Sequence, residues 1–129
     1  MPFAFQQINV EPRGKVHCVW LKRSCLTESD QLRMGEELAQ LITEDNCRRL
    51  ALSLGNDQLD CLYSMFLGKL VSTRRLIQEQ GGHMHLAEVG PASLGVLETC
   101  RLTDLFEIHA EMDAAVKALE SLDYTSRTM

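Results

Sequence analysis

Ser64 lies where a strand-like segment is expected to give way to a helix. Residues 59–82 read LDCLYSMFLGKLVSTRRLIQEQGG, a brief strand at 59–63, a tight turn at Tyr63-Ser64-Met65, and a helix that ends at Gly81-Gly82. The first N–H groups of a helix have no partner within it, so its start is suited to bind an anion or a protein partner. This turn is therefore the first candidate site, either for an anion or for a protein partner.

Histidine and cysteine side chains offer a second kind of chemistry. His83 and His85 are two residues apart on a predicted strand, so they face the same way and could share a metal ion. The sequence places no third ligand beside them, and a solvated sheet face explains them better. His17 and His109 are isolated, and none of the five cysteines lies in a C-x-x-C pair or a catalytic signature. We therefore expect no enzyme activity, no metal and no cofactor.

The overall composition is that of an ordinary globular protein. The 129 residues are 45% apolar and 24% charged, which suits a single domain over 1–129. The net charge of −5 disfavours binding to nucleic acid or to an anionic membrane. No apolar run reaches the roughly 20 residues of a membrane span, and the first residues lack a signal-peptide pattern. We expect a cytoplasmic protein with reduced thiols and no membrane insertion.

Alternating strand-like and helix-like segments must position the turn. The predicted strands are residues 4–10, 15–21, 48–54, 83–89 and 105–108, and EPRG at 11–14 is the expected turn of an opening hairpin. The predicted helices lie within 26–46, from the turn to Gly81-Gly82, over 92–100, and around 112–122. This order predicts an α/β fold, with a mixed, mostly parallel sheet of about five strands and helices packed against it.

Several short motifs follow one another in an order that is typical of a known family. Tyr63-Ser64-Met65-Phe66-Leu67-Gly68 opens the second helix, and Gly81-Gly82 closes it. The strand HMHLAEV, Pro91 and Leu105-Phe106-Glu107-Ile108 come next. Together they resemble the STAS domain, the fold of bacterial anti-sigma-factor antagonists, in which the second helix opens with Asp-Ser-Ser/Thr-Gly-Leu-Gly. The resemblance covers nearly the whole chain.

The turn departs from the family motif at its functional positions. The family's aspartate falls on Tyr63, its phosphorylated serine or threonine on Met65, and its glycine on Phe66. Ser64 falls on the serine before the usual acceptor, so its hydroxyl is one residue out of place. Met65 has no hydroxyl, so the resemblance implies that the usual phosphorylation switch is degenerate here.

The resemblance implies a non-catalytic domain of bacterial transcription regulation that binds a kinase-type anti-sigma factor. In the family, phosphorylation adds a charge of about −1.5 to −2 to the turn and disrupts the interface with this serine kinase. The alternative is a STAS-like subunit of a stressosome-type scaffold or a transporter accessory complex, including a homo-oligomer. The expected partner-binding residues are Leu62, Tyr63, Ser64, Met65, Phe66, Leu67, Gly68 and Lys69.

Two arrangements of the turn are open at this point. In the first, Tyr63, Ser64, Met65 and Phe66 form an exposed edge that binds a partner constitutively, with Ser64 as a displaced phosphorylation site. In the second, Met65 and Phe66 pack into the core and Ser64 only caps the helix.

Overall fold

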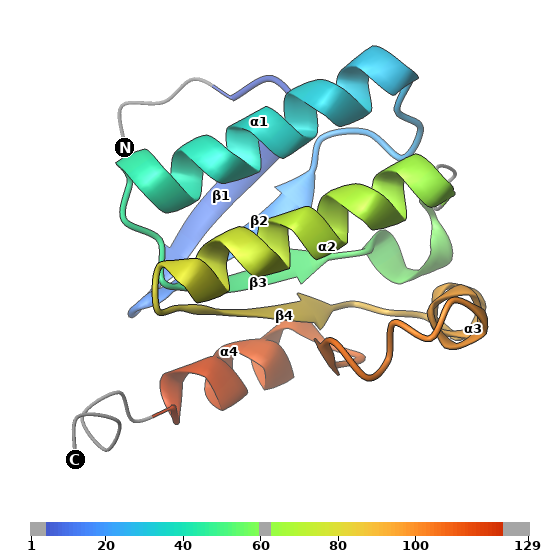
Figure 1. Cartoon of the computed structure of the whole chain (residues 1–129). Helices are drawn as coiled ribbons and strands as arrows, with labels where there is room; N and C mark the ends of the chain where they lie inside the picture. Colours follow the sequence, from blue (N-terminus) through green and yellow to red (C-terminus); the bar gives the residue numbers. More distant parts are fainter. Residues whose placement is uncertain (1–4, 60–62, 123–129) are drawn as a thin grey trace.

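One sheet with helices on both faces forms the fold (Figure 1). The computed structural model describes residues 5–59 and 63–122. The strands are β1 (Ile8–Arg13), β2 (Val16–Leu21), β3 (Arg49–Ser53), β4 (His83–Ala87) and β5 (Glu107–Ile108). The helices are α1 (Glu28–Glu44), the short 3₁₀ helix η1 (Gly55–Asp57), α2 (Ser64–Glu79), α3 (Pro91–Thr99) and α4 (Met112–Glu120). The predicted order of strands and α-helices is confirmed.

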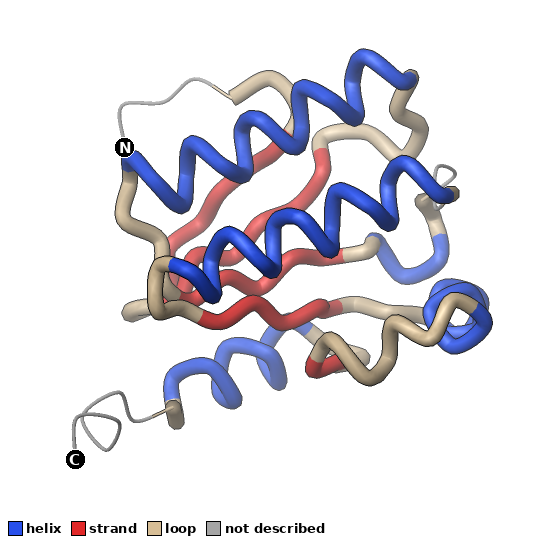
Figure 2. The backbone as a smooth tube through the Cα atoms, viewed as in Figure 1, coloured by secondary structure: helices blue, strands red, loops and turns tan. Residues whose placement is uncertain are grey.

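The sheet is mixed and mostly parallel, as the sequence predicts. Its strands lie in the order β1-β2-β3-β4-β5, with β1 antiparallel to β2 and the other neighbouring pairs parallel. Figure 2 shows the strands lying under the two long helices. Because parallel strands end at the same edge of a sheet, the segments that follow β2, β3 and β4 meet at one end of the molecule.

The opening hairpin turns later than the sequence predicted. Pro12 belongs to β1, and the two residues Gly14 and Lys15 connect the paired residues Arg13 and Val16. Gly14 has a φ of +59°, a left-handed conformation that such tight turns require. Pro12 is tolerated because β1 is the edge strand. The predicted strand at 4–10 is therefore shifted to Ile8–Arg13.

The two faces of the sheet differ in the size of their buried side chains. Leu50 and Leu52 of β3 and Leu86 of β4 pack in the larger cluster, together with residues of α1 and α2. Ala51 and Ala87 lie on the opposite face, in the smaller cluster with α4. This alternation follows from the two-residue period of a strand, and the small side chains let α4 lie close to the sheet.

The sequence predicts reduced thiols and no membrane-spanning helix. Cys18 and Cys47 are buried free thiols, and Cys25 and Cys100 are exposed free thiols. Within residues 5–59 and 63–122, no helix is both long enough and apolar enough to cross a membrane.

Candidate functional site

The start of α2 exposes some of the predicted contact residues and buries others. Tyr63 is the N-cap in an extended conformation, and its carbonyl accepts a hydrogen bond from Leu67 N at 2.9 Å. Tyr63 is 73% exposed and Met65 is 37% exposed, and Ser64 between them also faces solvent. Phe66 and Leu67 are buried in the larger core cluster. These two buried side chains therefore fix the first turn of α2 against the sheet.

Neither expected arrangement of the turn is realised in full. Phe66 packs into the core, as the second arrangement expected, whereas Met65 is exposed, as the first expected. The N-cap is Tyr63 rather than Ser64, and the Tyr63 side chain makes no capping hydrogen bond. A helix buries one face only, so neighbouring residues in its first turn can point in opposite directions.

The rest of the predicted contact segment lies further along α2 or outside the described residues. Gly68 is exposed, and Lys69 is half-buried. The aliphatic stem of Lys69 lies against Gly35 of α1, where an added Cβ would be 3.0 Å from Lys69 Cδ. Leu59 is in an irregular segment rather than in the strand predicted at 59–63, and Leu62 lies outside the described residues.

Large exposed hydrophobic side chains lie near the starts of α1 and α2. Within the described residues, the large exposed ones are Leu32 (46% exposed) on α1 together with Tyr63 and Met65. Figure 1 shows α1 and α2 side by side with both starts at the same end of the molecule. A groove of about 300 Å³ runs between them, lined by Leu32, Gly35, Glu36, Ala39, Lys69, Ser72, Thr73 and Leu76.

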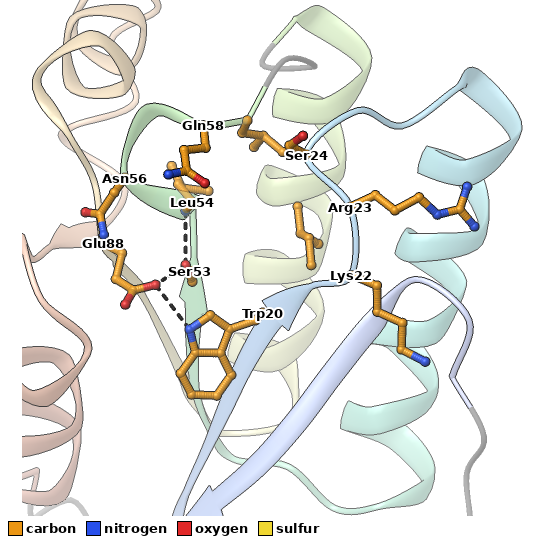
Figure 3. Close-up of a pocket in the computed structure, with 12 residues that line it drawn as sticks. Trp20, Lys22, Arg23, Ser24, Ser53, Leu54, Asn56, Gln58 and Glu88 are labelled. Carbon is orange, nitrogen blue, oxygen red and sulfur yellow. Dashed lines mark hydrogen bonds between the residues drawn. The ribbon is translucent and has the colours of Figure 1, made fainter.

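A cavity of about 470 Å³ opens at the carboxyl ends of β2, β3 and β4 (Figure 3). Trp20 Nε1 and Ser53 Oγ both donate to Glu88 Oε1, at 3.1 and 2.5 Å, and Gly55 N donates to Ser53 Oγ at 3.0 Å. This network ties the ends of three strands together. The cavity is lined by Trp20, Leu21, Lys22, Arg23, Ser24, Ser53, Leu54, Gly55, Asn56, Gln58, Leu59 and Glu88.

Asp57 joins the segment after β3 to the start of α3. Its Oδ1 accepts from Ser93 N at 2.8 Å, and its Oδ2 accepts from Ala92 N at 3.0 Å. These bonds lower the pKa of the Asp57 carboxyl below its usual value. They also supply a cap that α3 lacks, since its own N-cap is Gly90. An added Cβ at Gly90 would collide with the Asp57 carboxylate, so this close approach requires glycine.

The prediction of a solvated face is wrong for His85. Its side chain is 6% exposed, and its Nδ1 lies 3.1 Å from Nε2 of His109, with the two rings stacked at a centroid distance of 5.2 Å. Burial, with a further contribution from the nearby His109, lowers the pKa of His85 from 6.5 to about 4. The segment around β5 covers this part of β4, which strand periodicity alone could not show.

The sequence predicts an isolated His17 and a His83 that is part of a solvated sheet face. His17 is not isolated, because its Nε2 lies 3.3 Å from Asp45 Oδ2. His83 is half-buried. In the part of the chain that the structure describes, no three His, Cys, Asp or Glu side chains are grouped so that they could hold a metal ion.

Comparison with known proteins shows which family this chain belongs to. No protein-family model matches the chain. Over 98 residues, the chain is 32% identical to an anti-sigma F factor antagonist of Paenibacillus polymyxa, a match that covers 76% of this chain and 78% of the relative. The chain belongs to the STAS family of anti-sigma-factor antagonists.

Solved STAS structures share the architecture. An anti-sigma-factor antagonist (STAS) domain protein from Planctomyces limnophilus superimposes with a TM-score of 0.76 at 20% identity, covering 88% of this chain and 98% of that one. The phosphorylated form of SpoIIAA, a Bacillus cell fate determinant, has a TM-score of 0.66 at 13% identity, covering 86% and 97%. Identities this low show the fold alone, and that fold is the predicted one.

Sequence reasoning identified neither the cavity of this STAS domain nor the Asp57 clamp, by which we mean the hydrogen bonds from Ala92 N and Ser93 N to the Asp57 carboxylate. Trp20, Ser53 and Glu88 come from three segments that no short motif connects. The available signals were the single tryptophan of the chain and the strand break at Gly55-Asn56-Asp57. Neither signal shows that the two meet at one edge of the sheet.

Proposed function

We propose that this STAS protein binds a kinase-type anti-sigma factor through Leu32, Tyr63 and Met65, which we call the helix-start surface. The observation that carries the proposal is that these large hydrophobic side chains are exposed near the starts of α1 and α2, two helix starts that lie at the same end of the molecule. Grouped exposed hydrophobic side chains mark interaction sites more often than scattered ones do. The partner class is inferred from the relative in Paenibacillus polymyxa, which is named an anti-sigma F factor antagonist.

The helix-start surface has suitable chemistry for a protein interface. Tyrosine and methionine are enriched at such interfaces, because tyrosine offers a large area with few rotatable bonds and methionine adapts its shape. Buried Phe66 and Leu67 hold the backbone beneath Tyr63 and Met65, so both side chains are presented from an ordered helix turn. Binding would therefore not require this helix turn to become ordered first.

We further propose that the partner is bound constitutively, without the family's phosphorylation switch. In the family register, Met65 takes the position of the phosphorylated residue and has no hydroxyl group. Ser64 is exposed as the first residue of α2, one position earlier. A displacement of one residue in a helix rotates the side chain by about 100°, so a kinase site shaped for the usual position would not reach the Ser64 hydroxyl.

The test is to measure the affinity of the wild-type protein for kinase-type anti-sigma factors from its own organism by isothermal titration calorimetry. Tyr63→Ala and Met65→Ala should each weaken binding by at least tenfold, since aromatic and other central contacts dominate interface energies. Lys117→Ala is the matched control, because Lys117 is exposed on α4, on the opposite face of the sheet. Its affinity should equal that of the wild type.

Two results would contradict the proposal. If both alanine variants bind as tightly as Lys117→Ala, the helix-start surface is not the interface. If incubation with the kinase and ATP places phosphate on Ser64 and releases the partner, the binding is switched rather than constitutive. Mass spectrometry of the incubated protein detects phosphate on Ser64, and calorimetry measures the affinity of the alanine variants.

A further inference from the structure

The cavity at the ends of β2, β3 and β4 has features of a small-molecule site that the proposed function does not use. Its volume of about 470 Å³ falls within the range of about 300–1,000 Å³ that is typical of ligand sites. The carboxyl ends of parallel strands are a common place for such sites in α/β proteins. Its walls combine the indole of Trp20 with the amide side chains of Asn56 and Gln58 (Figure 3).

The backbone around this cavity adopts a left-handed conformation at several positions. Gly55, Asn56 and Asp57 have φ values of +75°, +52° and +70° in succession, and Glu88 has a φ of +53°. Residues other than glycine rarely adopt this left-handed conformation, and a glutamate is less suited to it than asparagine or aspartate. Strained residues collect at ligand sites, where they hold a side chain in a required position. At Glu88, the strained conformation accompanies a carboxylate that is held by Trp20 and Ser53.

Glu88 supplies the charge that faces the cavity. Its Oε1 accepts both hydrogen bonds, and no described residue donates to its Oε2. Lys22 and Arg23 also line the cavity, but Figure 3 shows both side chains extending away from Glu88. Lys22 Nζ donates to the carbonyl of Phe5, and Arg23 lies 3.6 Å from the carboxylate of Asp30.

A nearby positive charge does not neutralise this carboxylate. The guanidinium of Arg13 lies over the Trp20 ring, 5.6 Å from its centroid. However, Arg13 donates to Glu11 at 2.7 Å and to Asp113 at 3.0 Å, so its charge is already paired. The cavity therefore presents one hydrogen-bonded carboxylate with a remaining acceptor oxygen.

We propose that the cavity binds a small organic cation that carries a primary ammonium or guanidinium group. The cationic N–H groups would donate to Glu88 Oε2, since charge-assisted hydrogen bonds of this type are short and strong. The apolar part of the ligand would lie against Trp20 and Leu54, and the amides of Asn56 and Gln58 would contact its polar end. An anion would be repelled by Glu88, and a neutral molecule would desolvate the carboxylate without compensating its charge.

Trp20 makes this proposal directly measurable. It is the only tryptophan in the chain, so its fluorescence reports on the cavity alone. We would titrate the full-length protein with butylamine, butanol and butanoate, which are similar in size but cationic, neutral and anionic, and with agmatine as a larger cation. Butylamine and agmatine should produce saturable changes, and butanol and butanoate should bind at least tenfold more weakly.

Two variants test the role assigned to Glu88. Glu88→Gln keeps an acceptor oxygen for Trp20 and Ser53 but removes the charge, and it should weaken butylamine and agmatine binding at least tenfold. Glu98→Gln is the matched control, because Glu98 is exposed on α3 and does not line the cavity, and it should bind like the wild type. Asn56→Asp adds a second carboxylate at a left-handed position that aspartate accepts, and it should bind both cations several-fold more tightly.

Three results would overturn the proposal. Butanol or butanoate binding as tightly as butylamine would overturn the proposal, and so would unchanged cation affinity in Glu88→Gln. If Glu88→Gln does not fold, weaker cation binding by Asn56→Asp would overturn it instead. None of these measurements uses a protein partner, so their failure leaves the helix-start surface untouched.

Discussion

Acidification should destabilise this protein through the buried His85 and its half-buried partner His109. The pair joins β4 to the segment after β5, with 3.1 Å between Nδ1 of His85 and Nε2 of His109. One ring must donate and the other accept, so the hydrogen bond requires at least one neutral imidazole. Protonation of His85 is resisted first by burial and then by its histidine neighbours, His109 and His83, whereas Glu107 favours it.

The sign and size of the effect follow from the lowered pKa. His85 has a pKa of about 4 in the folded protein against 6.5 for the free side chain. Between these values the unfolded chain binds a proton that the folded protein does not, so stability falls as the pH falls from about 7 to 4. At 1.36 kcal/mol per pKa unit, this one group should remove about 2 kcal/mol of stability between pH 7.5 and pH 5. The loss is complete only below the folded pKa.

Urea denaturation of the wild type, His85→Asn and His83→Asn at pH 7.5, 6 and 5 measures this effect. Asparagine can still form a hydrogen bond but does not titrate, so His85→Asn should lose about 2 kcal/mol less than the wild type over this range. His83→Asn, on the same strand but half-buried, should retain most of the wild-type dependence, because His83 contributes less to the lowered pKa of His85 than burial and His109 do. Equal pH dependence in the wild type and His85→Asn would refute the reasoning. An NMR titration that places the His85 ring near its usual pKa would refute it as well.

Two further predictions concern the turn and the clamp. Phe66→Ala should lower the free energy of unfolding by about 3–5 kcal/mol, because it empties a fully buried site. Tyr63→Ala should change the free energy of unfolding by about 1 kcal/mol or less, because Tyr63 is exposed. Chemical denaturation of the two variants tests this contrast. Asp57→Asn should lower the melting temperature at pH 7, because it removes the charge that caps α3. Since the pKa of Asp57 is lowered in the folded protein, its contribution is present at neutral pH, and thermal melts should show the difference from the wild type shrinking below about pH 4.

The order of the elements could be predicted because each one carries its own periodic pattern. β3 was placed within one residue at each end, since its leucines alternate with smaller residues and Gly55 ends the run. The sequence misplaces the hairpin because Pro12 is typical of a turn, whereas the structure has it in β1. Proline removes a backbone donor, and only an edge strand has no need of that donor. Edge position is a property of the assembled sheet and cannot be read from the hairpin alone.

The candidate site was predictable only in part, for a similar reason. The motif located the start of α2, but it could not decide which of Met65 and Phe66 faces the core. That choice depends on the rotation of α2 against the sheet, which is set by buried residues further along the helix, such as Leu70 and Ile77. Strand alternation correctly put His83 and His85 on one face, but the cover over His85 comes from His109, which is distant in sequence.

The segment after β3 connects the cavity to the helix-start surface. Leu54, Gly55, Asn56 and Leu59 line the cavity, and the same stretch of chain continues toward Tyr63. Asp57 fixes the described part of this segment to α3 through its hydrogen bonds with Ala92 N and Ser93 N. A cation bound against Glu88 would contact the part of this segment that lines the cavity, and any effect it has on partner affinity must be matched by an equal effect of the partner on cation affinity.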